Sequence, residues 1–174
     1  IFFFLIIIFY HSFSQNEVKI LQSNSLENHN INSQIFDMFC GNVIAEYKEH
    51  TLYCDTILIS KDGRYIKASS KNFAKIIDSE GAQIQAKKIE FFKNDTIINF
   101  TKQVLFKKKR KEIHTDYLTY NPDKKIIYYK NGGKLIEEEN IISSQKGLYH
   151  TKYEFGQFLE NVKIKTNSYV IESN

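Results

Sequence analysis

Large apolar residues recur along the chain at intervals of about 30 positions, and each is followed two places later by a small residue. The spacings between successive small residues are 31, 32, 29, 29 and 29 positions. Repetition at a fixed period of this length indicates stacked structural units that share one core. The six pairs are Leu21 and Ser23, Leu52 and Cys54, Ile84 and Ala86, Ile113 and Thr115, Ile142 and Ser144, and Ile171 and Ser173.

Within each unit the apolar residues alternate at a period of two, which predicts β-strands. A step of three residues follows the small position, from Cys54 to Ile57 and from Thr115 to Leu118. In a regular strand this step would move the next apolar residue to the opposite face. It therefore predicts a bulge or bend inside a longer strand.

Turn-forming residues separate the expected strands at Lys61–Gly63, Asn121–Lys124 and Asn131–Gly133. Pro122 suits the second position of a type I turn, because its fixed φ matches that position. No segment keeps a helical period over three turns. The pattern thus predicts an all-β, solenoid-like stack in which each unit of about 30 residues contributes two or three strands.

The repeat is interrupted in its last two units. Gly147 and Gly156 stand where earlier units carry apolar residues, and the sixth unit stops at Asn174. An array that ends inside a unit leaves an edge strand without a partner, so we expect the natural protein to continue past residue 174.

The first ten residues, Ile1–Tyr10, are almost wholly apolar, and Ser12 and Ser14 precede Gln15. Small residues at these two places fit a signal-peptidase site that cleaves between Ser14 and Gln15. We predict a signal peptide at residues 1–14 that lacks its first residues, followed by one domain at 15–174. An uncleaved N-terminal anchor is the alternative, and both interpretations export the chain.

The chain has 174 residues, a formal net charge of +4, 25% charged residues and 14% aromatic residues. This composition excludes a wholly disordered chain. The two cysteines are too few for a disulfide scaffold or a four-ligand zinc site. The mild positive charge is compatible with an anionic partner without requiring one.

Cys54 is the strongest candidate for a nucleophile, because Asp55 adjoins it and His50 is near. It occupies the small-residue position of its unit, however, and a position that accepts alanine elsewhere needs small volume rather than a thiolate. A disulfide between Cys40 and Cys54 stays open, because sequence does not give the distance between their Cα atoms.

The five histidines have no partner at metal-ligand spacing, so we expect no metal site. The sequence also offers no constellation of His, Asp and Glu, and we expect no catalytic residue and no cofactor. The basic run Lys107–Lys111 lies between apolar strand segments. It is interpreted as a solvated turn within a hairpin, with contact to an anionic lipid or headgroup as the alternative. A nucleic-acid partner is not expected for an exported chain.

Several stretches resemble the OstA-like proteins of the lipopolysaccharide-transport (LptA/OstA) superfamily, in the variant typical of Bacteroidetes-type bacteria. The resemblance covers roughly Lys19–Asn174. It implies an elongated, twisted β-jelly-roll with an apolar interior, and carriage of lipopolysaccharide without catalysis. The stretches are Ser25–Leu26, Gly41–Val43, Leu52–Thr56, Thr115–Asn121, Tyr128–Gly133 and Ser143–Tyr149.

We therefore expect a periplasmic protein that carries a lipid A-type lipid in an apolar β groove. This expectation includes association with the outer membrane. Its expected partners are lipopolysaccharide, other transport components that pair through edge strands, and further copies joined head to tail. The alternatives are an exported structural β-solenoid, such as an adhesin or scaffold with a dry interior, and a periplasmic β-barrel enzyme. The residues expected to line the groove are Leu52, Cys54, Ile84, Ala86, Ile113, Thr115, Ile142 and Ser144.

Overall fold

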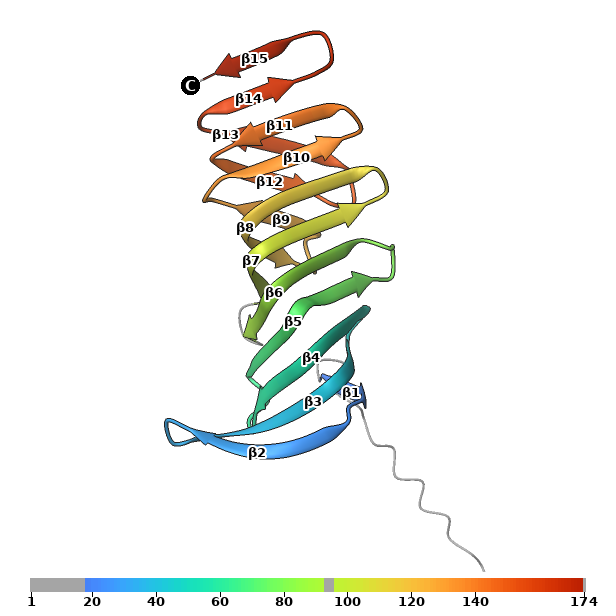
Figure 1. Cartoon of the computed structure of the whole chain (residues 1–174), viewed down its shortest axis with the longest axis vertical. Coiled ribbons are helices and arrows are strands. Elements are labelled where there is room, and N and C mark those ends of the chain that lie inside the picture. Colours follow the sequence, from blue (N-terminus) through green and yellow to red (C-terminus); the bar gives the residue numbers. More distant parts are fainter. Residues whose placement is uncertain (1–17, 93–95, 174) are drawn as a thin grey trace, which may run out of the picture.

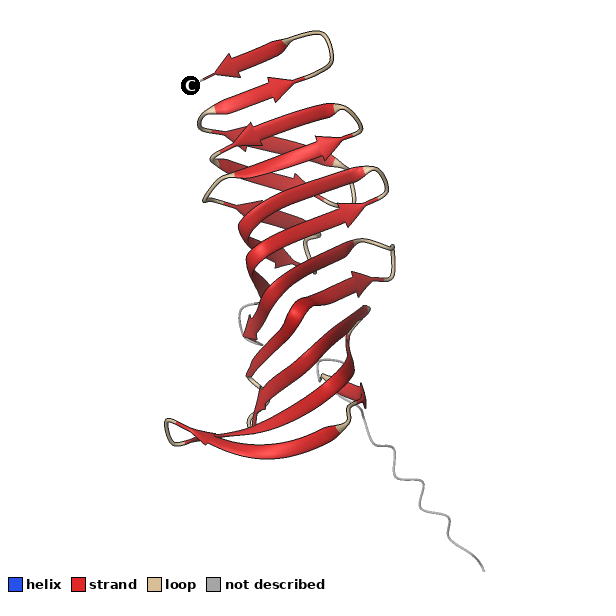
Figure 2. Ribbon diagram, in the orientation of Figure 1, coloured by secondary structure: helices blue, strands red, loops and turns tan. Residues whose placement is uncertain are grey.

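A computed structural model describes residues 18–92 and 96–173, and in this part of the chain every regular element is a β-strand (Figures 1 and 2). All pairings are antiparallel and join 15 strands into one sheet. The predicted signal peptide and its cleavage site lie outside the described residues. The strands are β1 (Lys19–Gln22), β2 (Ser25–Ile31), β3 (Gln34–Tyr47), β4 (His50–Ser60), β5 (Tyr65–Asp78), β6 (Gln83–Phe92), β7 (Ile97–Lys108), β8 (Lys111–Asn121), β9 (Ile126–Tyr129), β10 (Gly133–Glu137), β11 (Asn140–Ser144), β12 (Lys146–His150), β13 (Phe155–Leu159), β14 (Val162–Lys165) and β15 (Val170–Ser173).

The sheet is folded along its length into two facing layers, the arrangement of an elongated β-jelly-roll. Each of the long strands β3 to β8 crosses from one layer to the other, and the register of pairing shifts at the crossing. Beyond β8 the crossing strands are interrupted, so that β9, β12 and β13 lie behind β8, β10 and β11 (Figure 1). We call the layer with β1, β10, β11, β14 and β15 the first layer, and the layer with β2, β9, β12 and β13 the second layer.

The line of crossings, which we call the corner, is where the predicted bend lies. The pairing of β4 with β5 shifts between Tyr53 and Thr56, immediately around Cys54, which confirms the predicted break in alternation. Backbone of positive φ gathers at the corner, at Asn42 (49°), Lys102 (67°) and Gly132 (86°). This left-handed conformation reverses the side-chain alternation locally, as a bulge does.

The repeating apolar positions align across the first layer into one row that runs from β1 to β15. Cross-strand neighbours of this kind are the main packing unit of a sheet. A second row, beside the first and nearer the corner, carries smaller residues: Val43, Cys54, Ala74, Ala86, Val104, Thr115, Gly133 and Ser144. The first row consists of Ile20, Ala45, Leu52, Ile76, Ile84, Phe106, Ile113, Leu135, Ile142, Ile164 and Ile171.

The first unit departs from the predicted register. Leu21 is 46% exposed, and Ile20 takes the inward position opposite Ala45. The reason is an irregularity in the pairing of β1 with β3 between Ile20 and Gln22, which turns Leu21 outward.

The glycine at position 147 is explained by its neighbour on the adjacent strand. Gly147 pairs with Tyr129, and a Cβ at position 147 would lie 2.3 Å from the Tyr129 ring. Gly133 makes room for the same ring from the other side, where a Cβ would lie 2.6 Å away. One large ring thus fills the space that apolar side chains fill in other units.

Two of the three predicted turns lie where strands reverse. Lys61–Gly63 connects β4 to β5, and Asn121–Lys124 connects β8 to β9, with the backbone N–H of Lys124 donating to Asn121 Oδ1 over 2.9 Å. The third segment, Asn131–Gly133, lies at the corner between β9 and β10, so it passes the chain between layers instead of closing a hairpin.

Candidate functional site

The space between the two layers is the candidate functional site, because it is apolar along the length of the stack. Apart from Phe36, the buried apolar residues of the described chain form a single cluster with contributions from both layers. Aromatic rings meet across it: Tyr47 lies 4.8 Å from Phe91, and Phe106 lies 5.8 Å from Tyr149, between ring centroids. The first member of each pair belongs to the first layer and the second member to the second layer.

The predicted groove residues all lie in the two adjoining rows of the first layer. Ile113 and Ala86 have no measurable exposure, and Ile84, Cys54 and Ser144 are also buried. The other three, Leu52, Thr115 and Ile142, are half-buried. The structure therefore brings these positions together on the inner face, while contact with lipid stays a prediction.

An apolar cavity of about 40 Å³ lies inside the stack, between β3–β5 of the first layer and β5–β7 of the second. Of the predicted groove residues, Leu52 is part of its wall. A volume of this size accommodates about one small group and not an acyl chain. This part of the interior is therefore close-packed in this conformation. The cavity is lined by Val18, Ala45, Glu46, Tyr47, His50, Leu52, Ile66, Ala68, Ile76, Ile89, Phe91 and Ile98.

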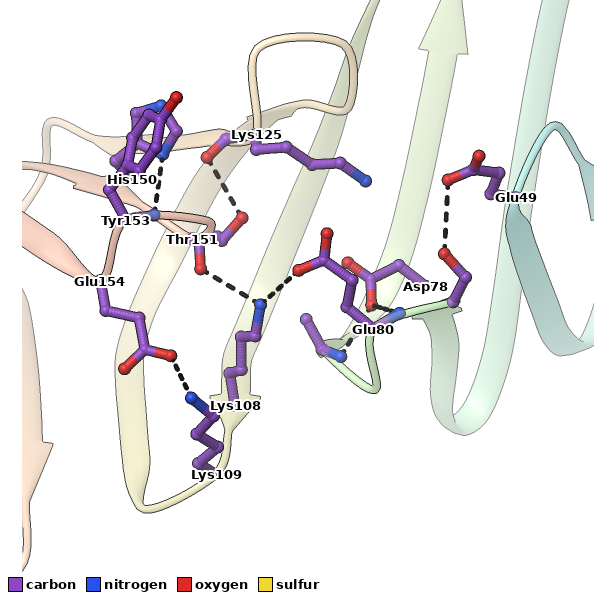
Figure 3. A network of polar contacts seen from close by, with 12 residues as sticks. Glu49, Asp78, Glu80, Lys108, Lys109, Lys125, His150, Thr151, Tyr153 and Glu154 are labelled. Carbon is purple, nitrogen blue, oxygen red and sulfur yellow. Dashed lines mark hydrogen bonds and ion pairs between the residues drawn. The ribbon is translucent and has the colours of Figure 1, made fainter.

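Opposite the corner, the two layers meet without a chain connection along a line that we call the seam. In residues 18–92 and 96–173, the hairpins on this side join strands of one layer, so within this part of the chain non-covalent contacts close the stack here. Lys108 makes the most buried hydrogen bond across the seam (Figure 3): its Nζ donates to the Thr151 carbonyl over 3.2 Å, and within its own layer it donates to Glu80 over 2.7 Å. The Lys108 ammonium also lowers the pKa of the Glu80 carboxyl.

Further ion pairs also cross the seam. Lys48 bonds Asp123 over 2.9 Å, and Lys109 bonds Glu154 in the neighbouring turn (Figure 3). In each pair the lysine belongs to the first layer and the carboxylate to the second. Polar side chains therefore hold the two layers together along the seam, while the interior between them is apolar.

The basic run forms the hairpin turn between β7 and β8, as the sequence predicts, but its side chains are not simply solvated. Each of its five cations bonds a carboxylate of this chain, and Lys108 is only 8% exposed. The side chains of Lys109 and Arg110 remain 70% and 81% exposed, so within the turn the departure from simple solvation is greatest at Lys108. The pairs are Lys107 with Glu112, Lys108 with Glu80, Lys109 with Glu154, Arg110 with Glu138, and Lys111 with Glu137 and Glu154.

Two buried polar residues beside the seam were not predicted to be buried from the sequence. His50 is 6% exposed, and its ring meets Tyr120 of the other layer at 5.9 Å between centroids. Asp78 is also buried, and its Oδ1 accepts the backbone N–H groups of Glu80 and Ala82. The burial of His50 could have been predicted, because side chains alternate between the two faces of a strand and His50 therefore shares the inward face with Leu52.

Burial lowers the pKa of His50, and the nearby Lys125 ammonium lowers it further. Asp78, the Tyr47 carbonyl and Glu49 oppose this shift without cancelling it. The imidazole is consequently neutral at physiological pH.

Cys54 is not placed as a nucleophile. Burial, followed by the charge of Asp55, raises the pKa of its thiol to about 12, which leaves almost no thiolate at neutral pH. Asp55 instead accepts the backbone N–H of Lys71 over 2.7 Å at the corner. Cys40 and Cys54 are both free thiols, so the disulfide that the sequence left open is not formed.

The histidine, cysteine and acidic side chains of residues 18–92 and 96–173 form no cluster of three or more that could hold a metal ion. Within the same residues, no helix is long and apolar enough to cross a membrane.

Both ends of the stack expose apolar residues of the sheet. Leu26 on β2, at one end, is 57% exposed, and Ile171 on β15, at the other end, is 52% exposed. Leu26 pairs with Phe39, which packs against the buried cluster, and Ile171 continues the first row beyond Ile164. The inner face of the sheet thus extends past the closed part of the stack at each end.

A long, folded antiparallel sheet with a continuous apolar interior, closed by a polar seam, defines a β-jelly-roll of the repeat-built, elongated class. The family model for OstA-like protein matches residues 15–174, and the chain belongs to this family. The resemblance noted in the sequence is thereby confirmed. No relative was found among the curated proteins.

Among solved structures, the chain is similar to LptH from Pseudomonas aeruginosa, described as the LptA-homologous periplasmic component of a lipopolysaccharide transport device. The two share 13% sequence identity with a TM-score of 0.45, over 92% of this chain and 96% of that chain.

Proposed function

We propose that this protein is a non-catalytic periplasmic carrier that holds the acyl chains of a lipid A-type lipopolysaccharide between its two layers. The observation that carries the proposal is the row of inward apolar residues that continues from β1 to β15 through the whole stack. Membership of the OstA-like family supports it, since the sequence resemblance links that family to lipopolysaccharide transport. Each methylene buried in such an interior contributes about 0.8 kcal/mol.

Loading requires the layers to separate, because the cavity between β3–β5 of the first layer and β5–β7 of the second has room for only about 40 Å³. The corner is continuous backbone, whereas the seam is held by side chains such as Lys108 and Lys48. Parting at the seam, with the corner as hinge, would expose both apolar rows. The eight predicted groove residues would then contact the acyl chains.

The exposed inner-face residues at both ends support the proposed assembly with other transport components or with further copies. A strand added beside β15 or β2 would continue the backbone pairing of the sheet and cover Ile171 or Leu26. That strand can come from another subunit or from a further segment of the same polypeptide. The periplasmic location rests on the predicted signal peptide at residues 1–14.

The packed interior favours a second candidate, an exported structural β-solenoid without cargo. In that case the close packing around Ile113, Phe106 and Leu118, none of which is measurably exposed, is the functional state itself. The two candidates differ in whether the layers ever separate.

Photocrosslinking from two neighbouring positions on β4 distinguishes them. Leu52 faces the interior and borders the cavity, whereas the adjacent Tyr53 faces outward and is 39% exposed. A photoreactive amino acid would replace each residue in turn, in a host that makes lipopolysaccharide. The carrier proposal predicts lipopolysaccharide crosslinks from position 52 and not from position 53. Crosslinks from neither position, in a folded protein, would favour the structural solenoid.

A further inference from the structure

The apolar interior contains polar atoms that the protein itself does not satisfy. Among the described residues, both ring nitrogens of His50 and the hydroxyl groups of Tyr120 and Tyr149 are buried without a hydrogen-bond partner. The Tyr47 carbonyl lies near the His50 ring, but not in hydrogen-bond geometry. Buried polar groups without partners are rare in folded proteins and call for an explanation.

These groups lie where a chain between the layers would pass. His50 lines the apolar cavity, and so does Ile98, which is the register partner of Tyr120 on the neighbouring strand. Tyr120 is not part of the cavity wall, but its ring packs against the His50 ring from the opposite layer, at 5.9 Å between centroids, so it lies directly behind a wall residue. Tyr149 lies farther along the stack, where it pairs with Ile127 in the same inward row as Tyr120.

The cost of these hydroxyl groups is avoidable, which makes their presence informative. Phenylalanine would fill nearly the same volume, and the same interior uses it at Phe91, Phe100 and Phe106. A third buried tyrosine, Tyr129, shows that the fold can satisfy such a group, because its hydroxyl hydrogen-bonds Ser144 Oγ over 2.7 Å. Tyr120 and Tyr149 differ from it in having no partner.

The chemistry of the three side chains identifies the group that would satisfy them. A tyrosine hydroxyl both donates and accepts, and a neutral imidazole carries one donor and one acceptor nitrogen. A hydroxyl group on the bound molecule can accept a hydrogen bond from these donors or donate one to these acceptors, whereas a methylene can do neither. A carboxylate or phosphate would instead require a free cation. The ammonium of Lys108 is already paired with Glu80, and the Lys125 ammonium near His50 also acts on the Glu80 carboxyl, whose pKa it helps to lower.

We propose that His50, Tyr120 and Tyr149 are specificity-determining residues that select acyl chains bearing a hydroxyl group over plain acyl chains. The inference rests on the proposed carrier function and names the class of chain that the interior prefers. The apolar rows then supply affinity for any chain, and these three residues supply the discrimination.

Competitive binding of palmitate and β-hydroxypalmitate to the purified protein tests this proposal, because the two probes share one chain length and differ by one hydroxyl. A net hydrogen bond contributes about 0.5–1.5 kcal/mol, so we expect the hydroxylated probe to bind roughly two- to tenfold more tightly. The double variant Tyr120→Phe/Tyr149→Phe should bring this preference close to one while it leaves the affinity for palmitate unchanged.

Tyr129→Phe is the matched control, since it removes a buried hydroxyl that already has a partner. It should keep the preference for β-hydroxypalmitate. Thermal unfolding of the unliganded variants gives a second readout: the melting temperature should not fall in the double variant, and should fall in Tyr129→Phe.

The outcomes separate this inference from the carrier proposal. Equal binding of the two probes by the unmodified protein, or a preference that survives in the double variant, would overturn the selectivity. Failure of both probes to bind would instead contradict the carrier function on which the selectivity rests.

Discussion

Lys108→Ala removes the most buried hydrogen bond between the two layers at the seam. The ammonium of Lys108 donates to the Thr151 carbonyl of the second layer and to Glu80 of its own layer, and the residue is 8% exposed. The substitution leaves the Thr151 carbonyl without this donor, while the Glu80 carboxylate, 43% exposed, can be hydrated.

Hydrogen bonds to charged groups contribute about 1.5–3 kcal/mol, and the exposure of Glu80 reduces its share. We therefore expect Lys108→Ala to lower the free energy of unfolding by about 2 kcal/mol. Lys107 is the matched control in the same turn: it is half-exposed and pairs with Glu112 on the next strand, inside one layer. Lys107→Ala should cost no more than about 0.5 kcal/mol.

Urea unfolding followed by circular dichroism measures both variants against the unmodified protein. Hydrogen exchange adds the location of the effect. The Thr151 amide, which donates to the Lys125 carbonyl over 2.8 Å at the seam, should exchange faster in Lys108→Ala. Corner amides such as that of Lys71 should be unchanged. Equal losses of stability in the two variants, or faster exchange at the corner alone, would refute a seam held by Lys108.

Three further predictions concern the interior. Gly147→Ala should destabilise the fold by about 1–3 kcal/mol, since its Cβ would lie 2.3 Å from the Tyr129 ring. Adding Tyr129→Leu should recover part of that loss. Thermal unfolding measures both variants, and no loss of stability in Gly147→Ala would show that the ring moves freely. Burial lowers the pKa of His50 below its ordinary 6.5, so the unfolded state binds the proton more readily. The free energy of unfolding should therefore fall as the pH drops below 6.5, and this fall should be smaller in His50→Leu. Denaturation at several pH values measures the two pH dependences, and identical slopes in both proteins would contradict the prediction. Cys54, with a thiol pKa of about 12, should resist iodoacetamide until the protein unfolds; mass spectrometry detects the adduct, and rapid labelling of the folded protein would disprove its burial.

The periodic part of the fold could be predicted from the sequence because cross-strand neighbours repeat the same chemistry. Ile84, Ile113 and Ile142 do lie in one row, and the small positions do lie beside it. The break in alternation after Cys54 also marks the corner correctly. The prediction was wrong at Leu21, because a single irregularity in the pairing of β1 with β3 shifts which residue faces inward.

The seam could not be predicted, because it joins hairpin turns that are far apart in the sequence. Lys108 meets Thr151 across 43 positions, and Lys48 meets Asp123 across 75. The repeat period does not specify these contacts, since they depend on how far the sheet twists and which turns then face each other. For the same reason, the run Lys107–Lys111 was interpreted as a solvated turn although one of its members is buried.

The exception at Gly147 carried a signal that a pairwise comparison could have used. A missing side chain in one strand is compensated by the large ring of Tyr129 in its neighbour. Comparing neighbouring strands for complementary side-chain sizes, instead of searching for the same residue in each unit, would have paired Gly147 with Tyr129. Packing density in protein interiors makes such compensation a general expectation.

Lipid content tests the central claim, carriage of lipid between the two layers, most directly. The protein would be produced in a host that makes lipopolysaccharide, purified without detergent and measured by native mass spectrometry. The account predicts stoichiometric lipid A-type species that added lipopolysaccharide displaces. A folded protein that is free of lipid and resists loading would contradict the account, and would favour the structural solenoid.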